Sequence, residues 1–504
     1  MECVCRPQDG QTLTFSMTPL SGLDAAFLYI ETPETPMHVG SVHLYDMPHG
    51  ERADFFERAR HHLESRLHLT SVFRRRLAKL PFDLAGPMWV EDRPVDLDYH
   101  LRRIVLRKPG TMATLEAEVA RLHGELLDRE HPLWMFYLIE GLASGQIAWY
   151  SKVHHASLDG AAGVHLANAL LDSTPKPRHI PRPRQRPLEP TPGAGRLIGA
   201  ALRNGAGQAA KMLRYLPELA RVLGGVVGAL PERGPVHLRR RRTLSPRTVF
   251  NVAITPERSF ATASIPLADV KAIATRHQVT VNDVVLALVS GALRRYLARH
   301  GGAPERPLVA AVPISLRAEE DKDYTTRATM VLASLATDLA DPVARLAAIH
   351  ASAGAGKSLA SHARSVIPTD FPSLGAPWLL AVAASVYGGA QRLASFPPFA
   401  NVVISNVWGP QSPLYFAGAR MLTFWPVSIV THGLGLNITV QSYCGSLDFG
   451  LIAASRAVPD IDKLVRALHA AHEELRSCAP SPAADLSQSA SAPRAARRGA
   501  HVRV

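Results

Sequence analysis

Two adjacent histidines are the residues of this chain whose types and spacing most directly suggest chemistry. Residues 151–160 read SKVHHASLDG, so His154 and His155 come just before an Asp-Gly pair, Asp159 and Gly160. A neutral imidazole can accept a proton near pH 7. Asp159 can fix a turn, and Gly160 admits backbone conformations that other residues resist. The stretch could be the base of an active site, half of a metal site, or a pair of structural histidines hydrogen-bonded at a strand end.

The metal-site interpretation is the weakest of the three. Such a site needs further ligands, often at His-x3-His spacing on a helix, and adjacent histidines do not easily face one ion. We therefore expect no metal. The sequence has no G-x-S-x-G motif, no P-loop and no G-x-G-x-x-G after a strand, so no covalent nucleophile is required. A histidine base without one suggests direct transfer, in which it deprotonates an alcohol, amine or thiol that attacks a bound, activated acyl group.

The elements on either side of the pair would hold it rigidly. Residues 146–153, QIAWYSKV, predict a strand that runs straight into the histidines, and residues 161–172, AAGVHLANALLD, predict a helix. The histidines are therefore expected at a strand-to-helix junction. Side chains at such a junction are held by rigid elements and remain reachable.

Strands and helices alternate in both halves of the chain, which favours two α/β lobes. A length of 504 residues is too great for one ordinary core. Helices are predicted at 54–67, 114–134, 267–278 and 280–299, and strands at 258–266 and 307–317. We expect a leader at 1–16, an N-terminal lobe at 17–174, a linker at 175–247, a C-terminal lobe at 248–478 and a disordered tail at 479–504.

Two of the predicted helices carry side chains with an expected local role. The helix at 54–67 has His61 and His62 with no acidic partner at a comparable spacing, so we expect both on a solvated face. The helix at 280–299 begins with Thr280 and Asp283 in the spacing of a capping box.

The net positive charge of the chain arises in the predicted linker region. Residues 174–247 hold sixteen Lys and Arg against three Glu, which accounts for the whole net charge of +13. A nucleic-acid enzyme would usually spread basic residues over a folded face with interleaved aromatic residues. We therefore expect no nucleic-acid partner, and the Pro/Arg-rich part at 175–192 should be extended.

The sequence also bears on the compartment. Cys3, Cys5, Cys444 and Cys478 are scattered, which fits a reducing cytoplasm better than a disulfide framework. The N-terminus lacks the apolar core of a signal peptide. The most continuous apolar run, 378–390, is short of the roughly 20 residues that span a bilayer. We expect a cytoplasmic protein that is soluble or peripheral to a membrane.

The pattern HHxxxDG at 154–160 resembles the signature of the CoA-dependent acyltransferase superfamily, which peptide-synthetase condensation domains share. Further segments narrow the resemblance: PLSGLDAAFL (19–28), FDLAGPMWVEDRPVDLDYHLR (82–102), HPLW (131–134), TVNDVVLALVSGALRRYL (280–297), VPISLR (312–317), SNVWGPQSPLYFAGA (405–419) and LNITVQSYCGSLDFG (436–450). Together they resemble the bacterial wax ester synthase/diacylglycerol acyltransferase family, notably its actinobacterial triacylglycerol synthases, over about residues 17–478.

The resemblance implies two chloramphenicol-acetyltransferase-like lobes with a tunnel between them. Acyl-CoA would enter from one end as a co-substrate and the acceptor from the other, and no resident cofactor is expected. By the same resemblance His155 is the general base and His154 supports it. Asp159 would hold the loop through an arginine salt bridge, with Arg317 as a partner to consider, and Gly160 would let the helix begin close by.

Two further residues are expected to bind substrate. Asn282 is a donor for the oxyanion formed at the thioester carbonyl, although a helix N-cap explains it equally well. Trp134 belongs to the HPLW segment, where it would contact substrate or shape the lobe.

The activity implied is transfer of a fatty acyl group from acyl-CoA to the hydroxyl of diacylglycerol, and also of a long-chain alcohol. The alternatives are a condensation-type acyltransferase that uses another lipid acceptor, and a weakly active lipid-binding paralogue. The second is favoured by residues 325–327, where the family often has a Gly-Asn pair, and Trp408 also replaces the usual Pro. The basic residues of 176–242 would hold the enzyme at the inner membrane or at lipid droplets, or the segment would be a solvated tether between the lobes.

Overall fold

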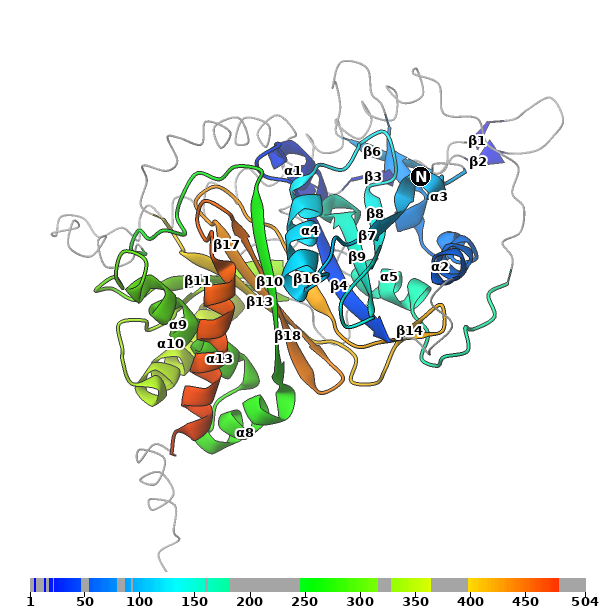
Figure 1. The fold of residues 1–504 in the computed structure, drawn as a ribbon. Helices are drawn as coiled ribbons and strands as arrows, with labels where there is room; N and C mark the ends of the chain where they lie inside the picture. Colours follow the sequence, from blue (N-terminus) through cyan, green and yellow to red (C-terminus); the bar gives the residue numbers. More distant parts are fainter. Residues whose placement is uncertain are drawn as a thin grey trace, which may run out of the picture.

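The chain folds into two lobes that lie side by side, each built on a β-sheet (Figure 1). The structure is a computed structural model. It describes residues 4–5, 13–14, 18–20, 22–46, 54–78, 87–91, 94–158, 162–181, 245–315, 328–363 and 398–479.

The N-terminal lobe contains a seven-stranded sheet in the order β14-β15-β4-β9-β8-β7, with β16 paired to β4. Its strands are β4 (His38–Asp46), β7 (Leu101–Val105), β8 (Trp134–Glu140), β9 (Ile147–His154), β14 (Tyr415–Phe416), β15 (Ala419–Met421) and β16 (Trp425–Val427). A smaller sheet joins β3 (Thr18–Pro19), β6 (Met88–Glu91) and β5 (Arg75–Leu77), and β1 (Val4–Cys5) pairs with β2 (Leu13–Thr14). The helices are α1 (Gly22–Ile30), α2 (Phe55–Glu64), α3 (Leu97–His100), α4 (Met112–Gly124) and α5 (Ala162–Leu170).

Strand β9 is buried on both faces, because alternate residues enter two different hydrophobic clusters. Ala148 and Tyr150 belong to the larger cluster, which continues into the C-terminal lobe. Trp149 and Val153 belong to the cluster under α2. A strand held on both faces and paired with β4 and β8 on both edges gives its last residues a fixed position.

The C-terminal lobe contains a six-stranded sheet in the order β10-β18-β17-β13-β11-β12. Its strands are β10 (Arg258–Pro266), β11 (Val309–Ser315), β12 (Ala328–Ser334), β13 (Val402–Val407), β17 (Leu436–Tyr443) and β18 (Ser446–Ala454), and its helices are α8 (Leu267–His277), α9 (Val281–Ala298), α10 (Pro342–Ala363) and α13 (Ile461–Ser477). Helix α9 packs against α8, α10 and α13, so most of its side chains are buried. The predicted helices and strands of this half are confirmed, as is the capping box of Thr280 and Asp283.

The two lobes are joined by strands that the C-terminal half of the chain contributes to the N-terminal sheet. Strands β14, β15 and β16 lie at 415–427, between β13 and β17 of the C-terminal sheet, yet they extend the N-terminal sheet. Strand β16 then passes so close to β18 that a Cβ on Gly450 would lie 1.6 Å from the carbonyl oxygen of Pro426. The lobes are therefore not contiguous stretches of sequence, as the predicted ranges 17–174 and 248–478 had them.

The predicted linker falls largely outside the described residues, which stop at 181 and resume at 245. Most of the predicted leader, 1–16, and the tail from 480 also lie outside them, so these assignments remain predictions. The first linker residues are described, and they pack on the N-terminal lobe. Arg178 donates to the carbonyl oxygens of Leu171 (2.9 Å) and Ala169 (3.0 Å), at the C-terminal end of α5.

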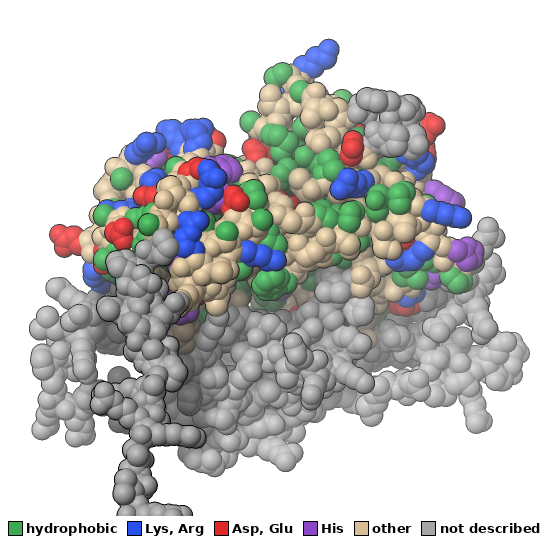
Figure 2. Space-filling view, turned by 90° about the horizontal axis from the view of Figure 1, so that it is seen from below, with side chains coloured by type: hydrophobic (Ala, Val, Ile, Leu, Met, Phe, Trp, Pro, Cys, Tyr) green, Lys and Arg blue, Asp and Glu red, His purple; other side chains and the backbone are tan. Residues whose placement is uncertain are grey.

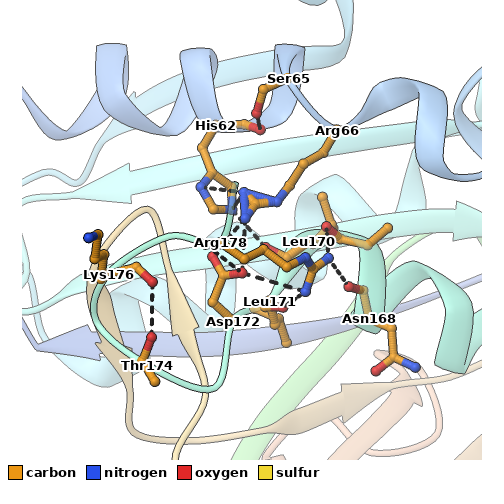
Figure 3. A network of polar contacts seen from close by, with 11 residues as sticks. His62, Ser65, Arg66, Asn168, Leu170, Leu171, Asp172, Thr174, Lys176 and Arg178 are labelled. Carbon is orange, nitrogen blue, oxygen red and sulfur yellow. Dashed lines mark hydrogen bonds and ion pairs between the residues drawn. The ribbon is translucent and has the colours of Figure 1, made fainter. Parts of the chain in front are cut away.

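The expectation of a solvated face for both histidines of α2 is wrong for His62, which is 5% exposed. Its Nε2 donates to the carbonyl oxygen of Leu170 (2.7 Å), and the Arg66 guanidinium lies against its ring. Arg66 in turn makes two hydrogen bonds, of 2.9 and 2.8 Å, to the buried carboxylate of Asp172 (Figure 3). Arg178 reaches the same carboxylate from the other side, so the end of α5 is tied to α2.

The lobes also meet through one buried carboxylate. Helix α4 packs against β10, which is an edge strand, and Glu116 Oε1 accepts from both the N–H and the Oγ1–H of Thr262, each at 2.7 Å. Burial raises the pKa of Glu116, and the hydrogen bonds from Thr262 oppose that rise. A donor left unpaired at the sheet edge is thus satisfied by the neighbouring lobe.

Replacing Glu116 with Ala should lower the free energy of unfolding by about 1–3 kcal/mol, because two half-buried donors of Thr262 lose their acceptor. The matched control is Glu118→Ala on the same helix, where a surface pair with Arg121 is lost and about 0–1 kcal/mol is expected. Urea unfolding followed by circular dichroism measures both. Equal losses in the two variants would contradict the role given to Glu116.

Candidate functional site

The two histidines lie where β9 leaves the sheet and a short turn, η4 (His155–Ser157), begins. Three backbone hydrogen bonds fix this turn. The N–H of His154 donates to Leu133 (2.9 Å), that of His155 to Met37 (2.8 Å), and that of Leu158 to His155 (3.0 Å). The predicted strand is confirmed, and its end is held from both neighbouring strands.

Both ring nitrogens of His154 are occupied. The side chain is fully buried, and Nδ1 accepts from the backbone N–H of Ala156 at 3.1 Å. Nε2 lies 3.2 Å from Glu31 Oε1, within ion-pair distance although outside good hydrogen-bond geometry. Because Nδ1 accepts, the ring proton must be on Nε2, facing the carboxylate. His154 therefore has no free lone pair with which to take a proton from a substrate.

Glu31 is the centre of the polar contacts behind the histidines. Oε1 also accepts from the N–H of Met37 (3.0 Å), and Oε2 accepts from Arg129 Nη2 (2.9 Å). Burial acts to raise the pKa of this carboxyl, but the contacts with His154, Met37 and Arg129 hold it below its usual value. Glu31 is thus a carboxylate at neutral pH.

His155 is engaged differently. Its ring stacks on Phe27 of α1, with centroids 3.9 Å apart and planes 20° from parallel. Nδ1 is buried and makes no hydrogen bond to another residue among those the structure describes. Burial lowers the pKa of His155 to about 4, the neighbouring His154 adds to the shift, and its own backbone opposes it. The imidazole is therefore neutral at pH 7, and Nε2 is the nitrogen left to meet a substrate.

The remaining residues of the motif are partly outside the described ranges. Asp159 and Gly160 lie outside them, as do Arg317 and residues 325–327, so the roles expected there remain predictions. Ser157 is 1% exposed, and its carbonyl oxygen accepts from Arg75 Nη2 at 2.7 Å. Arg75 on β5 is thus a described arginine that holds the loop next to Asp159.

Asn282 lies on α9, whereas Trp134 begins β8 and pairs with Val153, the residue before His154. Asn282 is half-buried in the first turn of α9, and its explanation as the N-cap is wrong because Thr280 is the cap residue. Trp134 is fully buried; its Nε1–H donates to the carbonyl oxygen of Phe73 (3.1 Å), and its ring stacks on His100. The assignment of Trp134 to substrate binding is not supported, because the indole is part of the core.

Lys152, the polar residue that precedes the histidines on β9, makes structural hydrogen bonds. Lys152, two residues before His154, donates to the carbonyl oxygens of Leu122 (2.7 Å) and Glu125 (2.5 Å) at the end of α4. Burial lowers the pKa of Lys152 to about 8 and that of His123 to about 3. Within the described ranges no three His, Cys, Asp or Glu side chains are grouped as metal ligands.

Sequence reasoning missed Phe27, Glu31 and Arg129. Phe27 and Glu31 lie four residues apart in GLDAAFLYIE, a spacing that puts them on one helix face. That spacing predicts a shared helix face, but it does not predict that this face contacts the histidines. Arg129 has no local signal, because its partner is 98 residues away.

Comparison with known proteins gives the site its context. A family model described as wax ester synthase/diacylglycerol acyltransferase catalytic domain matches residues 20–285, and the C-terminal domain model of the same family matches 326–476. The probable diacylglycerol O-acyltransferase tgs2 of Mycobacterium tuberculosis is 36% identical over 468 residues, covering 90% of this chain and 97% of that protein. The O-acyltransferase WSD of Acinetobacter baylyi is 35% identical over 463 residues, with 89% and 95% covered.

Solved structures agree with the fold. The wax ester synthase/diacylglycerol acyltransferase of Marinobacter aquaeolei is 32% identical, with a TM-score of 0.64 and 91% of this chain and 98% of that chain covered. The first condensation domain of the calcium-dependent antibiotic synthetase has a TM-score of 0.52 at 16% identity, over 92% of this chain and 98% of that chain, which shows a common fold. The predicted α/β fold of two chloramphenicol-acetyltransferase-like lobes is confirmed; the tunnel between them stays a prediction.

Burial of His155 should be visible as a pH dependence of stability. The unfolded chain binds a proton on this residue below about pH 6.5, whereas the folded chain does so only near pH 4. The free energy of unfolding should therefore decrease as the pH is lowered from 6.5 to 4, by about 1.4 kcal/mol per pH unit for each such histidine. His155→Gln should reduce the slope between pH 6.5 and 5 by that amount.

The control is His61→Gln, which replaces an exposed histidine of α2 and should keep the wild-type slope. Urea unfolding at several pH values gives the slopes. An unchanged slope in His155→Gln would show that the ring is not held neutral by burial.

Proposed function

The chain belongs to the wax ester synthase/diacylglycerol acyltransferase family of O-acyltransferases, and from that premise we propose that it transfers a fatty acyl group from acyl-CoA to the hydroxyl of diacylglycerol. The product is triacylglycerol. Long-chain alcohols are further acceptors, and they would give wax esters. The observation that carries the proposal is the unequal use of the two histidines: Nδ1 of His154 accepts from Ala156 and its Nε2 faces Glu31, whereas Nδ1 of His155 has no hydrogen-bond partner within the described ranges, and its Nε2 is left for a substrate.

In the proposed reaction His155 is the general base. Its Nε2 takes the proton of the acceptor hydroxyl while the hydroxyl oxygen attacks the thioester carbonyl. The tetrahedral intermediate collapses to the ester and expels the CoA thiolate, which recovers the proton from the imidazolium. The lowered pKa keeps the base unprotonated at neutral pH, and the positive charge it gains is stabilised by the negative oxygen that forms at the same time.

The other motif residues have supporting roles in this proposal. His154 caps the turn that carries His155, which is a positioning role. Asp159 and Gly160 would shape the loop that follows. Asn282 is a side-chain amide donor for the oxyanion, with its half-buried place in the first turn of α9 as the support. Acyl-CoA is a co-substrate in this scheme, and no resident cofactor takes part in it.

The proposal is tested with labelled acyl-CoA and either diacylglycerol or hexadecanol as the acceptor. The wild type should form labelled triacylglycerol, and His155→Ala should lower kcat by about 10²–10⁴-fold because the base is lost. Ser157→Ala is the control, since its hydroxyl is buried and makes no hydrogen bond among the described residues. It should keep wild-type activity.

Each other outcome of this assay would favour a different function for the chain. No product from the wild type with either acceptor would favour a lipid-binding paralogue. Product with another acceptor, such as an amine or a different lipid hydroxyl, would favour a condensation-type acyltransferase. Equal product from the wild type and His155→Ala would refute the base.

The second part of the proposal is that the protein associates with lipid surfaces through the basic segment within 176–242. No helix in the described parts of the chain has both the length and the apolar character needed to cross a membrane. On the face seen in Figure 2, Lys and Arg side chains are spread over both lobes among Asp and Glu, and hydrophobic side chains are frequent toward the N-terminal lobe. A basic segment adds attraction to anionic lipids of about 1 kcal/mol per residue near the surface.

Replacing the Lys and Arg residues of 182–242 with Gln should abolish sedimentation with anionic liposomes and leave the fold intact. Residues 176–181 are kept, because Arg178 caps α5. Binding of the wild type should weaken as salt rises. Sedimentation that is unchanged in the Gln variant would refute this part of the proposal.

A further inference from the structure

Helix α1 and the residue that follows it contact both histidines. Phe27 lies in α1, and Glu31, four positions on, directly follows its last residue, Ile30. Phe27 stacks on His155, and Glu31 lies against His154. The two histidines are therefore contacted by the last turn of α1 and by the residue that follows it.

Phe27 restricts the ring of His155 directly. The centroid distance of 3.9 Å and the angle of 20° describe a stacked pair, in which rotation of the imidazole about χ2 would break the contact. Both side chains are half-buried, so the phenyl ring also covers one face of the imidazole. The ring has no other anchor among the described residues, since Nδ1 is unpaired.

Glu31 acts on His155 through two routes. The first runs through His154: the carboxylate keeps the proton on Nε2, which leaves Nδ1 to accept from Ala156 and so to cap the turn that starts at His155. The second runs through Met37, whose N–H donates to Glu31 (3.0 Å) and whose carbonyl oxygen accepts from His155 N–H (2.8 Å). Both routes end on the backbone that sets the direction of the His155 side chain.

Arg129 fixes Glu31 to its own helix. Its Nη2 donates to Glu31 Oε2 (2.9 Å) and to the carbonyl oxygen of Leu28 (2.7 Å). The carboxylate is 2% exposed, and the arginine is 46% exposed, so the positive charge balances a buried negative charge from the solvent side. The order of contacts is Arg129, Glu31, His154, Ala156.

We propose that Phe27 and Glu31 are positioning residues for acyl transfer, Phe27 by stacking on His155 and Glu31 by setting the proton on His154 and holding Met37. The proposal rests on the proposed function, in which His155 is the base. It assigns to α1, in the GLDAAFLYIE segment, the task of holding Nε2 of His155 toward the acceptor hydroxyl. Neither residue touches the reacting atoms in this scheme.

The effect of a positioning residue falls on kcat, because a base displaced by about 1 Å can cost up to about 10²-fold in rate. Phe27→Leu removes the flat partner but keeps an apolar side chain, and kcat should fall about 10–100-fold with KM for acyl-CoA within about twofold of wild type. Phe56→Leu, at a half-buried phenylalanine of α2, is the matched control and should leave both constants unchanged.

Glu31→Ala should lower kcat about 100-fold, and Glu31→Gln should recover most of it, because an amide oxygen can still accept from Met37 and His154. In a His154→Asn background the effect of Glu31→Ala should be smaller, since an Asn at this position can cap the turn without help. Glu118→Gln on α4 is the control for loss of a carboxylate. Thermal unfolding by circular dichroism checks that each variant is folded.

The outcomes separate this proposal from the one beneath it. An inactive wild type, or an active His155→Ala, overturns the proposed function. An active wild type and an inactive His155→Ala, together with wild-type kcat in Phe27→Leu and Glu31→Ala, overturn the positioning role alone. A rise in KM at constant kcat would also overturn it, because it would place these residues in substrate binding.

Discussion

The site depends on the burial of one imidazole, that of His154, between a carboxylate and a backbone N–H. His154 is fully buried, and a buried histidine is tolerated only when both ring nitrogens have partners or the ring stays neutral. Glu31 on one side and Ala156 on the other satisfy it and fix its tautomer. This arrangement supplies part of what gives His155 its direction, because His154 caps the turn that carries His155.

The same arrangement explains why the two histidines can be neighbours and still differ. At the end of a strand adjacent residues point to different sides. His154 is buried beside β4, where its role is structural. His155 stacks on Phe27 of α1. Among the described residues Nδ1 of His155 has no hydrogen-bond partner, which costs about 1–3 kcal/mol for a buried group. A cost of this kind is what a functional site accepts.

The sequence predicted the fold well where the physics is local. Helical periodicity located α2, α8 and α9, the Thr280–Asp283 box located the start of α9, and the strand predicted at 146–153 located β9. It failed where partners are distant. His62 looked solvated because Asp172 and Leu170, its surroundings, lie more than a hundred residues away, and β14–β16 were missed because strands of two or three residues carry no alternation.

For the site, the sequence named the two histidines and the acyl-transfer chemistry, and the geometry now separates their roles. Trp134 illustrates the opposite case, since a motif residue with a large aromatic side chain proved to be core. The positioning residues could not be read from sequence, because a Phe and a Glu four residues apart are ordinary. Their meaning comes only from what α1 packs against.

A final consequence concerns why the carboxylate contacts His154 and not the base. A carboxylate paired directly with His155 would favour the imidazolium and raise its pKa, opposing the burial that now lowers it to about 4. With Glu31 one residue removed, its charge is balanced by Arg129 and its influence reaches His155 as geometry through the backbone. Glu31 thus fixes the orientation of His155 without stabilising its protonated form. Such a base stays unprotonated over a wide range of pH and gains its proton only when a substrate oxygen approaches with negative charge developing beside it, which links proton transfer to the attack on the acyl group.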